Sequence, residues 1–386
     1  MKVGMEYCYD AHVQKHMHVL WRSKSGMKRA MIAMSGGVDS SVAALLMKEA
    51  GYECAGVTMR LFRETAHVSS CGRSCCSDAD EEDAAFVCHQ LGIPHEPACF
   101  SRLFEEKVIR KFIREYENGR TPNPCVDCNQ FLKFEALMEQ AKTEGFDVLV
   151  TGHYARVRYC EELKRWQLLK AADEKKDQSY VLYMMTQEQL AHLCFPLGEL
   201  QKSDTRSLAE KSGLVTAEKR DSQDICFIPN GDYTEFIQRW TGRSYPEGEI
   251  VDCSGRAVGR HRGLIRYTIG QRHGLRVSAE EPVYVIGKDL ASNTLTVGPK
   301  EALFHKELIA ENFNWLSIQE PDGPIRVTAR TRYHQPEAAA VIYPLPDSQI
   351  HVIFDETQRA MTPGQAVVLY QGELILGGGT ISTVLN

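Results

Sequence analysis

A short glycine-rich segment near the start of the chain constrains the fold most. Residues 35–41 read Ser-Gly-Gly-Val-Asp-Ser-Ser, and they lie between an apolar stretch at residues 30–34 and a compact helical pattern at residues 42–49. Glycines let the backbone approach a ligand closely, and N–H groups at the start of a helix bind phosphate. A bare turn with two glycines usually binds nothing, but the whole string between a strand and a helix favours a phosphate site. The lysine of a Walker loop is missing, so the site is of another kind.

The rest of the first half alternates between strand and helix patterns. Strands are predicted at residues 52–59, 94–100 and 146–150, and helices at residues 78–91 and 103–116. Such alternation predicts an α/β fold with a doubly wound parallel sheet, in which ligands gather at the carboxyl ends of the strands.

After about residue 228, Gly and Pro separate short β-like runs, at residues 283–286, 294–297, 325–329, 338–342, 350–354, 366–370 and 373–376. Many short strands at close spacing predict a small β-rich domain followed by a β-barrel. We therefore expect an N-terminal extension (1–26), an α/β catalytic domain (27–228), a central β-rich domain (229–305) and a C-terminal β-barrel (306–386).

Composition narrows the setting. The 386-residue chain has 13 cysteines and a net charge of −6. Residues 1–26 match neither a secretory signal nor a transit peptide, and we interpret them as a disordered extension or as sequence upstream of a true start at Met27. Reduced thiols with catalytic or metal roles are then expected rather than a disulfide scaffold. Since no apolar run approaches the about 20 residues that span a bilayer, we expect a cytoplasmic protein with no membrane partner.

Three cysteines stand in turn-like, polar surroundings. Cys125 and Cys128 follow the Pro-rich turn at residues 121–124, and Cys226 comes 98 residues after Cys128. Thiolates accept and hand on sulfur, so two such cysteines beside a loop that activates an oxygen suggest replacement of oxygen by sulfur. The plain alternative is burial as small apolar side chains. A further alternative is a 4Fe-4S cluster held by all three thiolates. Zinc is less favoured, because a fourth ligand at standard spacing is missing.

A second group of potential metal ligands precedes and enters the helix predicted at residues 78–91. Its spacing is irregular, so a mobile loop followed by ordinary helix cysteines is the favoured interpretation. The group consists of His67, Cys71, Cys75, Cys76, Cys88 and His89.

The glycine-rich string resembles the signature of the PP-loop ATP pyrophosphatases, which cleave ATP between its α and β phosphates and adenylate a substrate oxygen. From about residue 27 to the end, the chain closely resembles one family of that superfamily, the tRNA-specific 2-thiouridylases. The matching stretches are residues 35–41, 75–77, 121–134, 151–154, 176–180, 222–228, 267–272 and 362–365.

The resemblance implies a reaction and its residues. ATP, with Mg²⁺, would bind at Ala33, Met34, Ser35, Gly36, Gly37, Val38, Asp39, Ser40, Met59 and Gly152. The 2-oxygen of the wobble uridine of tRNA would be adenylated. Cys226 would take sulfur as a persulfide from a carrier protein or cysteine desulfurase, and Cys128 would complete the transfer. Contacts with tRNA would come from Asn123, Pro124, Cys125, His153, Lys176, Asp177, Gln178, Arg332, Tyr333 and Gln365. Some members of the family carry an acidic residue where this chain has Cys125, which keeps the cluster version open.

RNA binding by an acidic protein requires local basic surfaces. Residues 260–276 hold five arginines and two histidines around Tyr267, and a second group comprises Arg326, Arg330, Arg332, Tyr333 and His334. Basic and aromatic residues together suit phosphate contacts and base stacking, although each group could simply be a solvated face. Two other functions remain open at this stage, namely a different PP-loop adenylating ligase and a binding module without chemistry.

Overall fold

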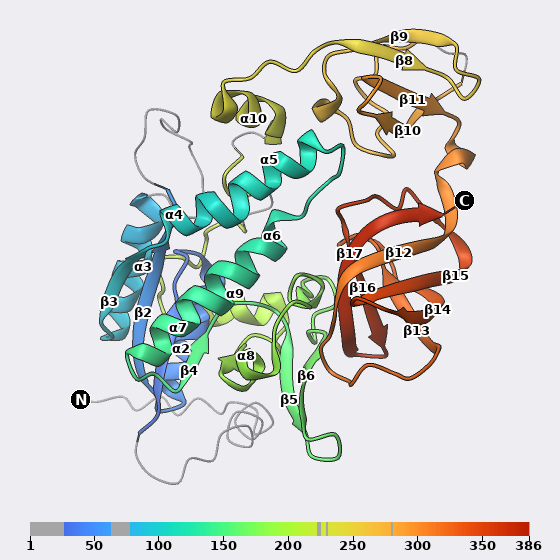
Figure 1. Cartoon of the computed structure of the whole chain (residues 1–386). Helices are drawn as coiled ribbons and strands as arrows, with labels where there is room; N and C mark the ends of the chain where they lie inside the picture. Colours follow the sequence, from blue (N-terminus) through green and yellow to red (C-terminus); the bar gives the residue numbers. More distant parts are fainter. Residues whose placement is uncertain (1–26, 63–77, 222–224, 229–230, 279–280, 386) are drawn as a thin grey trace.

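The structure is a computed structural model, and it describes residues 27–62, 78–221, 225–228, 231–278 and 281–385. The N-terminal extension and the segment with His67, Cys71, Cys75 and Cys76 lie outside the described residues. Figure 1 shows an α/β unit, a small β unit and a barrel in chain order. Among the described residues, no helix combines the length and apolarity needed to cross a membrane.

The first unit is built on a five-stranded parallel sheet. Its order is β3 (His95–Cys99), β2 (Glu53–Arg60), β1 (Arg29–Ala33), β4 (Val148–Val150) and β7 (Leu193–Cys194). The chain winds outward from β1 in both directions, which creates a crevice beyond the carboxyl ends of β1 and β4. The doubly wound sheet predicted from the alternation is confirmed.

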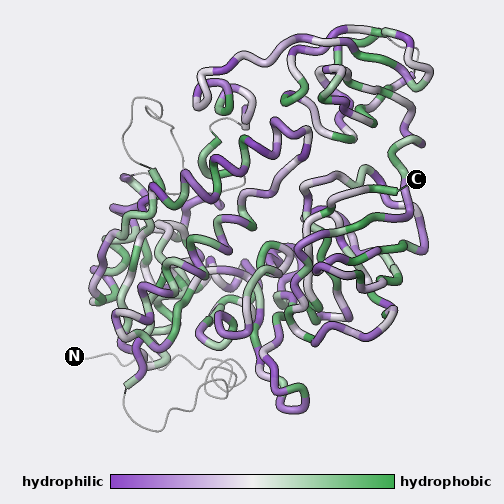
Figure 2. The backbone as a smooth tube through the Cα atoms, viewed as in Figure 1, coloured by the Kyte–Doolittle hydropathy of each residue, from purple (hydrophilic) through white to green (hydrophobic). Residues whose placement is uncertain are grey.

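Helices cover both faces of this sheet, because successive side chains of a buried parallel strand point to opposite sides. Ala30 and Ile32 of β1 pack with α2 (Val38–Glu49), α3 (Asp78–Leu91) and α9 (Lys202–Lys211). Met31 instead faces the helix formed by α6 (Pro124–Asp127), η2 (Cys128–Ala136) and α7 (Leu137–Thr143). Figure 2 shows apolar segments running through this layer.

One more long helix and several short helices remain. A second long helix consists of α4 (Ser101–Phe104), η1 (Glu105–Ile109) and α5 (Arg110–Glu117). The remaining short helices are η3 (Ser179–Val181), α8 (Gln187–Ala191), η5 (Leu264–Arg266) and η6 (Lys300–Leu303).

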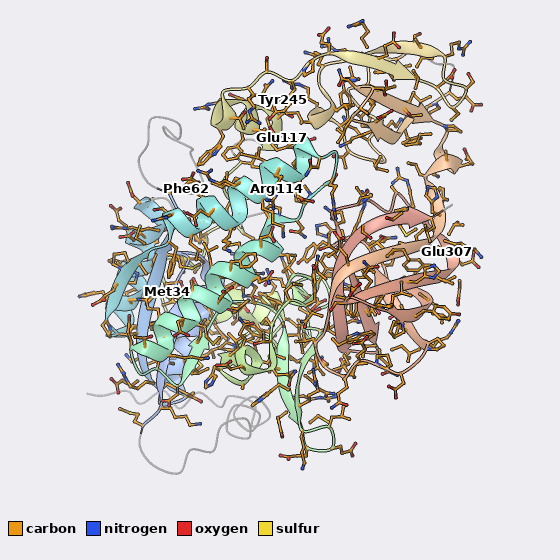
Figure 3. The ribbon with its side chains drawn as sticks, viewed as in Figure 1. Met34, Phe62, Arg114, Glu117, Tyr245 and Glu307 are labelled. Atoms are coloured by element: carbon orange, nitrogen blue, oxygen red, sulfur yellow. The ribbon has the colours of Figure 1, made fainter. Side chains whose placement is uncertain are left out.

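The small β unit follows α10 (Tyr233–Thr241). Its sheet has the order β10 (Tyr284–Asp289), β11 (Thr294–Gly298), β8 (Gly248–Val251), β9 (Ala257–His261). The carboxylate of Glu117 on α5 accepts hydrogen bonds from the Tyr245 hydroxyl at 2.7 Å and from Arg243 at 3.0 Å. Figure 3 shows Glu117 and Tyr245 facing each other from these two units. The Tyr116 and Tyr233 rings stack at 4.4 Å beside them, so the small unit is fixed to α5.

The last unit is a closed antiparallel barrel, as predicted. Strands follow in the order β12 (Phe304–Trp315), β15 (Gln349–Arg359), β14 (Ala338–Leu345), β13 (Ile325–Arg330), β16 (Ala366–Gln371), β17 (Leu374–Leu385), and β17 pairs back with β12. Side chains two apart, such as Ile350, Val352 and Phe354, fill its interior.

One hairpin of the first unit was not predicted, and it ties that unit to the barrel. β5 (Arg156–Cys160) and β6 (Arg165–Leu169) extend the barrel sheet, with Leu168 and Leu169 pairing with β17. Leu168 N–H also donates to the Ser317 hydroxyl at 3.0 Å. Main-chain hydrogen bonds therefore join the barrel to the α/β unit, in addition to the chain that connects them.

Candidate active site

The glycine-rich loop lies at the carboxyl end of β1 and is held by its own hydroxyls. Gly36 has φ +68°, and a Cβ there would lie 2.1 Å from the Asp80 carbonyl oxygen on α3. Only glycine fits this position. The Ser40 hydroxyl accepts from Ser35 N–H at 3.1 Å and donates to the Gly37 carbonyl at 3.0 Å. These bonds fix the loop around the start of α2.

The start of α2 is suited to bind an anion. Its N-cap is Gly37, which has no side chain to cap the first N–H groups of this 12-residue helix. Uncapped N–H groups and the positive end of the helix dipole attract phosphate. This geometry suits an anion, and binding of the ATP phosphates at residues 35–40 stays a prediction.

A second loop touches the first. Gly152 follows β4, and a Cβ there would lie 2.8 Å from both Asp39 C and Ser40 N. The structure thus brings Gly152 against the glycine-rich loop at the topological switch point. Met59, at the end of β2, packs half-buried against the apolar clusters on the other side of the sheet.

An ion-pair network anchors Asp39. Lys202, at the first position of α9, donates to both carboxylate oxygens of Asp39 at 2.7 and 2.8 Å. The Tyr154 hydroxyl donates to the same carboxylate at 2.9 Å. Lys202 also lies 2.9 Å from a carboxylate oxygen of Asp221, which binds Lys176 and Arg206 at 2.8 Å each. The network links the glycine-rich loop to the segment that leads to Cys226.

The sequence reasoning missed Lys202, Asp221 and Tyr154. One local signal pointed to Lys202: a lysine in the first helical turn opposes the helix dipole, so its presence there suggests a specific partner. Asp221 and Tyr154 carried no comparable signal, because their partners are far away in the sequence.

The network makes a testable prediction about acid stability. Burial raises the pKa of Asp221, but hydrogen bonds from Lys176 and Lys202 outweigh it and lower the pKa to about 2. A depressed carboxyl pKa stabilises the fold above the unfolded value of about 3.9, and that stabilisation is lost as the pH falls toward 2. We expect Asp221→Asn to reduce the free energy of unfolding at pH 7 by about 1 kcal/mol.

Urea unfolding of the two proteins at pH 7, 4 and 3 would measure this difference, which should shrink below pH 4. The exposed Asp322 provides the control, since Asp322→Asn should leave the wild-type stability unchanged at each pH. A constant difference between Asp221→Asn and wild type would contradict the network's role.

Cys128 and Cys226 pack against one apolar cluster. Cys128 begins η2, Cys226 lies beyond Asp221, and both are half-buried against the cluster that contains Phe112 and Phe227. Two cysteines that are 98 residues apart in the sequence thus pack against the same apolar cluster. Cys125, one turn before Cys128, is exposed, whereas Cys88 is buried inside α3.

Two residues predicted to contact tRNA have inward-facing side chains. His153 is 8% exposed, and its ring lies 2.6 Å from the Thr151 hydroxyl and 3.5 Å from the Lys133 ammonium. Burial and the Lys133 charge hold the pKa of His153 well below its usual range. Asp177 is 6% exposed and accepts bonds from Ala171 N–H and from the Ser179 hydroxyl.

Lys176 and Gln178 bond to residues of the ion-pair network around Asp39 of the glycine-rich loop. The Gln178 side chain accepts from Tyr154 N–H at 3.0 Å, and Lys176 pairs with Asp221. Their roles in tRNA contact stay predictions, as do those of His153 and Asp177.

The three barrel residues predicted to contact tRNA lie in different surroundings: Gln365 bonds to the Pro-rich turn, Tyr333 to Asp177, and Arg332 to other residues of the barrel and of the small β unit. The Tyr333 hydroxyl donates to the Asp177 carbonyl at 3.1 Å. Burial, then the charges of Asp177 and Cys125, raise the pKa of Tyr333 to about 12. Gln365 donates to the Thr121 carbonyl at 2.8 Å, while Arg332 donates to the Ala360 carbonyl at 2.8 Å.

The turn itself is stiff. Asn123 caps α6 by accepting from Cys125 N–H at 3.2 Å, and Pro124 occupies the first helical turn. Pro124 is buried, whereas Asn123 is half-buried and Cys125 exposed. Only part of this predicted tRNA contact region is therefore open to solvent.

The basic segment at residues 260–276 is only partly a surface. Tyr267 is 4% exposed and His261 is fully buried, with its ring on the Asn293 carbonyl at 2.9 Å. The idea that Tyr267 stacks on a base is therefore wrong, because its ring faces the core of the small unit. The exposed basic side chains of the segment are those of Arg260, Arg262, Arg272, His273 and Arg276.

The second basic group is largely engaged within the protein. Arg326 pairs with Asp355, and Arg330 pairs with Glu337 at 2.9 Å. Burial and the charge of Arg359 lower the pKa of Arg332. His334 is exposed.

In the described part of the chain, no group of three or more His, Cys, Asp or Glu side chains could hold a metal ion.

Family models match three consecutive parts of the chain. The tRNA methyl transferase HUP domain matches residues 28–230, the tRNA methyl transferase PRC-barrel domain residues 234–299, and the aminomethyltransferase beta-barrel domain residues 305–381. The three matches follow the order of the α/β unit, the small β unit and the barrel.

Solved structures resemble the chain only weakly. A 4-thiouridine synthetase–RNA complex with bound ATP is 16% identical, covers 55% of this chain and 50% of that chain, and has a TM-score of 0.36. The NMN synthetase from Francisella tularensis is 15% identical, covers 61% of this chain and 86% of that chain, and has a TM-score of 0.36. Likeness at this level carries no conclusion about the site.

Curated relatives match over nearly their whole length. The tRNA-specific 2-thiouridylase MnmA of Acetivibrio thermocellus is 45% identical over 92% of this chain and 99% of that protein. The MnmA proteins of Moorella thermoacetica and Caldanaerobacter subterraneus are each 48% identical over 92% of this chain, and the matches cover 99% and 97% of those proteins. With this identity and coverage, the chain belongs to the tRNA-specific 2-thiouridylase family.

Proposed function

We propose that this chain converts the wobble uridine of tRNA to 2-thiouridine, using ATP to activate the 2-oxygen and a cysteine persulfide to supply sulfur. One observation carries the proposal: a glycine-rich phosphate loop and two half-buried cysteines belong to one α/β unit. The names of the relatives support the substrate. On the same grounds we propose the cytoplasm as the place of action.

The first half of the reaction would take place at the glycine-rich loop. The start of α2 and Ser35 would hold the triphosphate, and the close contact of Gly152 would keep the loop in place. The uridine 2-oxygen attacks the α-phosphorus of ATP, and pyrophosphate leaves. The wobble base must leave its stack for this oxygen to become reachable.

Mg²⁺ is expected to arrive with ATP, where it neutralises triphosphate charge. The only carboxylate within residues 35–41 is that of Asp39, and both its oxygens already accept hydrogen bonds from Lys202. We therefore assign no metal to Asp39. Lys202 instead fixes the carboxylate, and through it the first turn of α2.

The second half would use the two cysteines. The terminal sulfur of a Cys226 persulfide attacks C2 of the adenylated base, and AMP leaves. The Cys128 thiolate then attacks Cys226 Sγ, so the bond between Sγ and the transferred sulfur breaks. Sulfur stays on the base, and a Cys128–Cys226 disulfide remains that a thiol reductant must reduce before the next turnover. A persulfide-carrying protein would reload Cys226.

The cluster version receives less support. A 4Fe-4S site would need the thiolates of Cys125, Cys128 and Cys226 to surround one iron–sulfur cluster. The described residues do not form such a group, and Cys125 is exposed whereas Cys128 and Cys226 are half-buried. We therefore derive no step through a cluster. Anaerobic purification with an absorbance spectrum would reveal an iron–sulfur chromophore if one exists.

Product analysis tests the proposal. The purified chain is incubated with ATP, tRNA and a persulfide donor, and tRNA nucleosides are examined by mass spectrometry. We expect 2-thiouridine together with AMP and pyrophosphate in a ratio of about one to one, as adenylation requires. Formation of ADP, or AMP release without any thiouridine, would contradict it. Full activity of Cys128→Ala would instead favour another adenylating ligase.

A further inference from the structure

A barrel loop at residues 362–365 is hydrogen-bonded to the turn at residues 121–124, which precedes the helix that carries Cys125 and Cys128. Thr121 N–H donates to the Pro363 carbonyl at 2.9 Å, and the Thr121 carbonyl accepts from Gln365 Nε2 at 2.8 Å. The Pro122 carbonyl lies 3.4 Å from the same amide nitrogen. Both main-chain groups of Thr121 are thus bound by one barrel loop.

The fit between loop and turn is tight. Gly364 has φ +92°, and a Cβ there would lie 2.9 Å from Thr121 N and 3.0 Å from Thr121 O. A side chain at this position would have to push the turn away. Next to it, Arg120 pairs with Glu311 of β12 at 2.9 Å.

The barrel loop is itself fixed. Gly364 N–H donates to the Ile381 carbonyl at 2.9 Å, and Ile381 N–H returns a bond to the Gln365 carbonyl at 2.8 Å. Arg332 donates to the Thr362 hydroxyl at 2.9 Å and to the Ile269 carbonyl of the small β unit at 3.2 Å. All three units therefore meet at this loop.

The turn at residues 121–124 determines where the helix with Cys125 and Cys128 begins. Prolines at 122 and 124 fix two φ angles, and Asn123 caps the helix that carries Cys125 and Cys128. Little freedom is left between Thr121 and Cys125, so a shift at Thr121 moves the start of the helix. We propose that Gln365 and Gly364 are positioning residues that set the place of Cys128, acting on the Thr121 main chain rather than on RNA. This inference rests on the proposed function of Cys128.

The test separates positioning from RNA contact. Gln365→Glu keeps the shape but directs a carboxylate at two carbonyl oxygens, and Gly364→Ala pushes on Thr121. Gln371→Glu and Gly372→Ala are the matched controls in the same barrel, since Gln371 is exposed and Gly372, at φ +60°, has open space around it. Iodoacetamide labelling of Cys128 is followed by peptide mass spectrometry without ATP or tRNA. Filter binding gives the Kd for tRNA, and single-turnover assays give the thiolation rate.

We expect both variants to label Cys128 about threefold faster than wild type, because the loosened turn exposes the thiol. Thiolation should fall about tenfold or more, as small misplacements of a reacting group do, while the Kd for tRNA stays within about twofold. The controls should match wild type in every measurement.

Unchanged labelling would overturn the inference, with or without a weaker Kd, and so would faster labelling with a normal thiolation rate. Labelling does not depend on thiolation. If wild type made no thiouridine, the proposed function would fail. Faster labelling of Cys128 in the two variants would still show that the barrel loop holds the turn in place. If Gln365→Glu does not fold, Gln365→Met removes the same donor without adding a charge.

Discussion

Cys226→Ser is expected to abolish thiolation, with the single-turnover rate of 2-thiouridine formation falling about 10³-fold or more. A serine hydroxyl cannot carry a transferable sulfur atom, so the second half of the reaction has no nucleophile. Adenylation should survive, because Cys226 packs on the apolar cluster with Phe227 and the adenylation step uses no thiol. One equivalent of pyrophosphate per enzyme should therefore still appear in a rapid burst.

Cys128→Ser should behave differently. Sulfur reaches C2 but the bond to Cys226 is not broken, so a covalent enzyme–tRNA adduct should accumulate and run slowly on a denaturing gel without reductant. Cys253→Ser, at an exposed cysteine of the small β unit, should match wild type in both assays. Normal thiouridine yields from Cys226→Ser would rule out the persulfide route, and loss of the pyrophosphate burst would show that this cysteine also shapes the ATP site.

Local patterns were enough to predict the layers of this fold. Residues 30–34 and 148–150 are short apolar runs, as expected for strands buried on both faces, and helix patterns lie between them. The turn at residues 35–41 between a strand and a helix could also be predicted, since its glycines and hydroxyls interact within a few residues of each other, and its role in phosphate binding stays a prediction. Both predictions rest on interactions that are local in the sequence.

Long-range pairing set the limit. The β5–β6 hairpin alternates weakly, and nothing in its sequence indicates that Leu168 and Leu169 pair with β17 about 200 residues later. Tyr267 was expected at the surface because basic residues surround it in the sequence, and His153 was expected to contact tRNA from the family resemblance, yet tertiary packing buries both. Lys202 joins two carboxylates from distant segments, and only its unusual place at the start of a helix gave a hint.

Gly152→Ala is expected to lower ATP consumption about 10²-fold while leaving tRNA binding intact. The added methyl would lie 2.8 Å from Asp39 C and Ser40 N, which are main-chain atoms of the first turn of α2. They cannot move aside like a flexible side chain, so the loop must shift and its N–H groups lose their aim at the phosphates. Overpacking should also reduce the free energy of unfolding by about 1–3 kcal/mol.

Isotope exchange between pyrophosphate and ATP, measured with tRNA present, reports adenylation alone and avoids the cysteine steps. Gly323→Ala is the control, because a methyl group there meets nothing within 4 Å. Apart from His153, the predicted tRNA contacts lie on other segments, so the Kd for tRNA should change less than about threefold in Gly152→Ala, and lost exchange with such near-normal binding assigns the defect to the loop. Exchange at the wild-type rate would mean that the loop tolerates a shift at Asp39, and the tight contact between the two loops would then have no part in holding ATP.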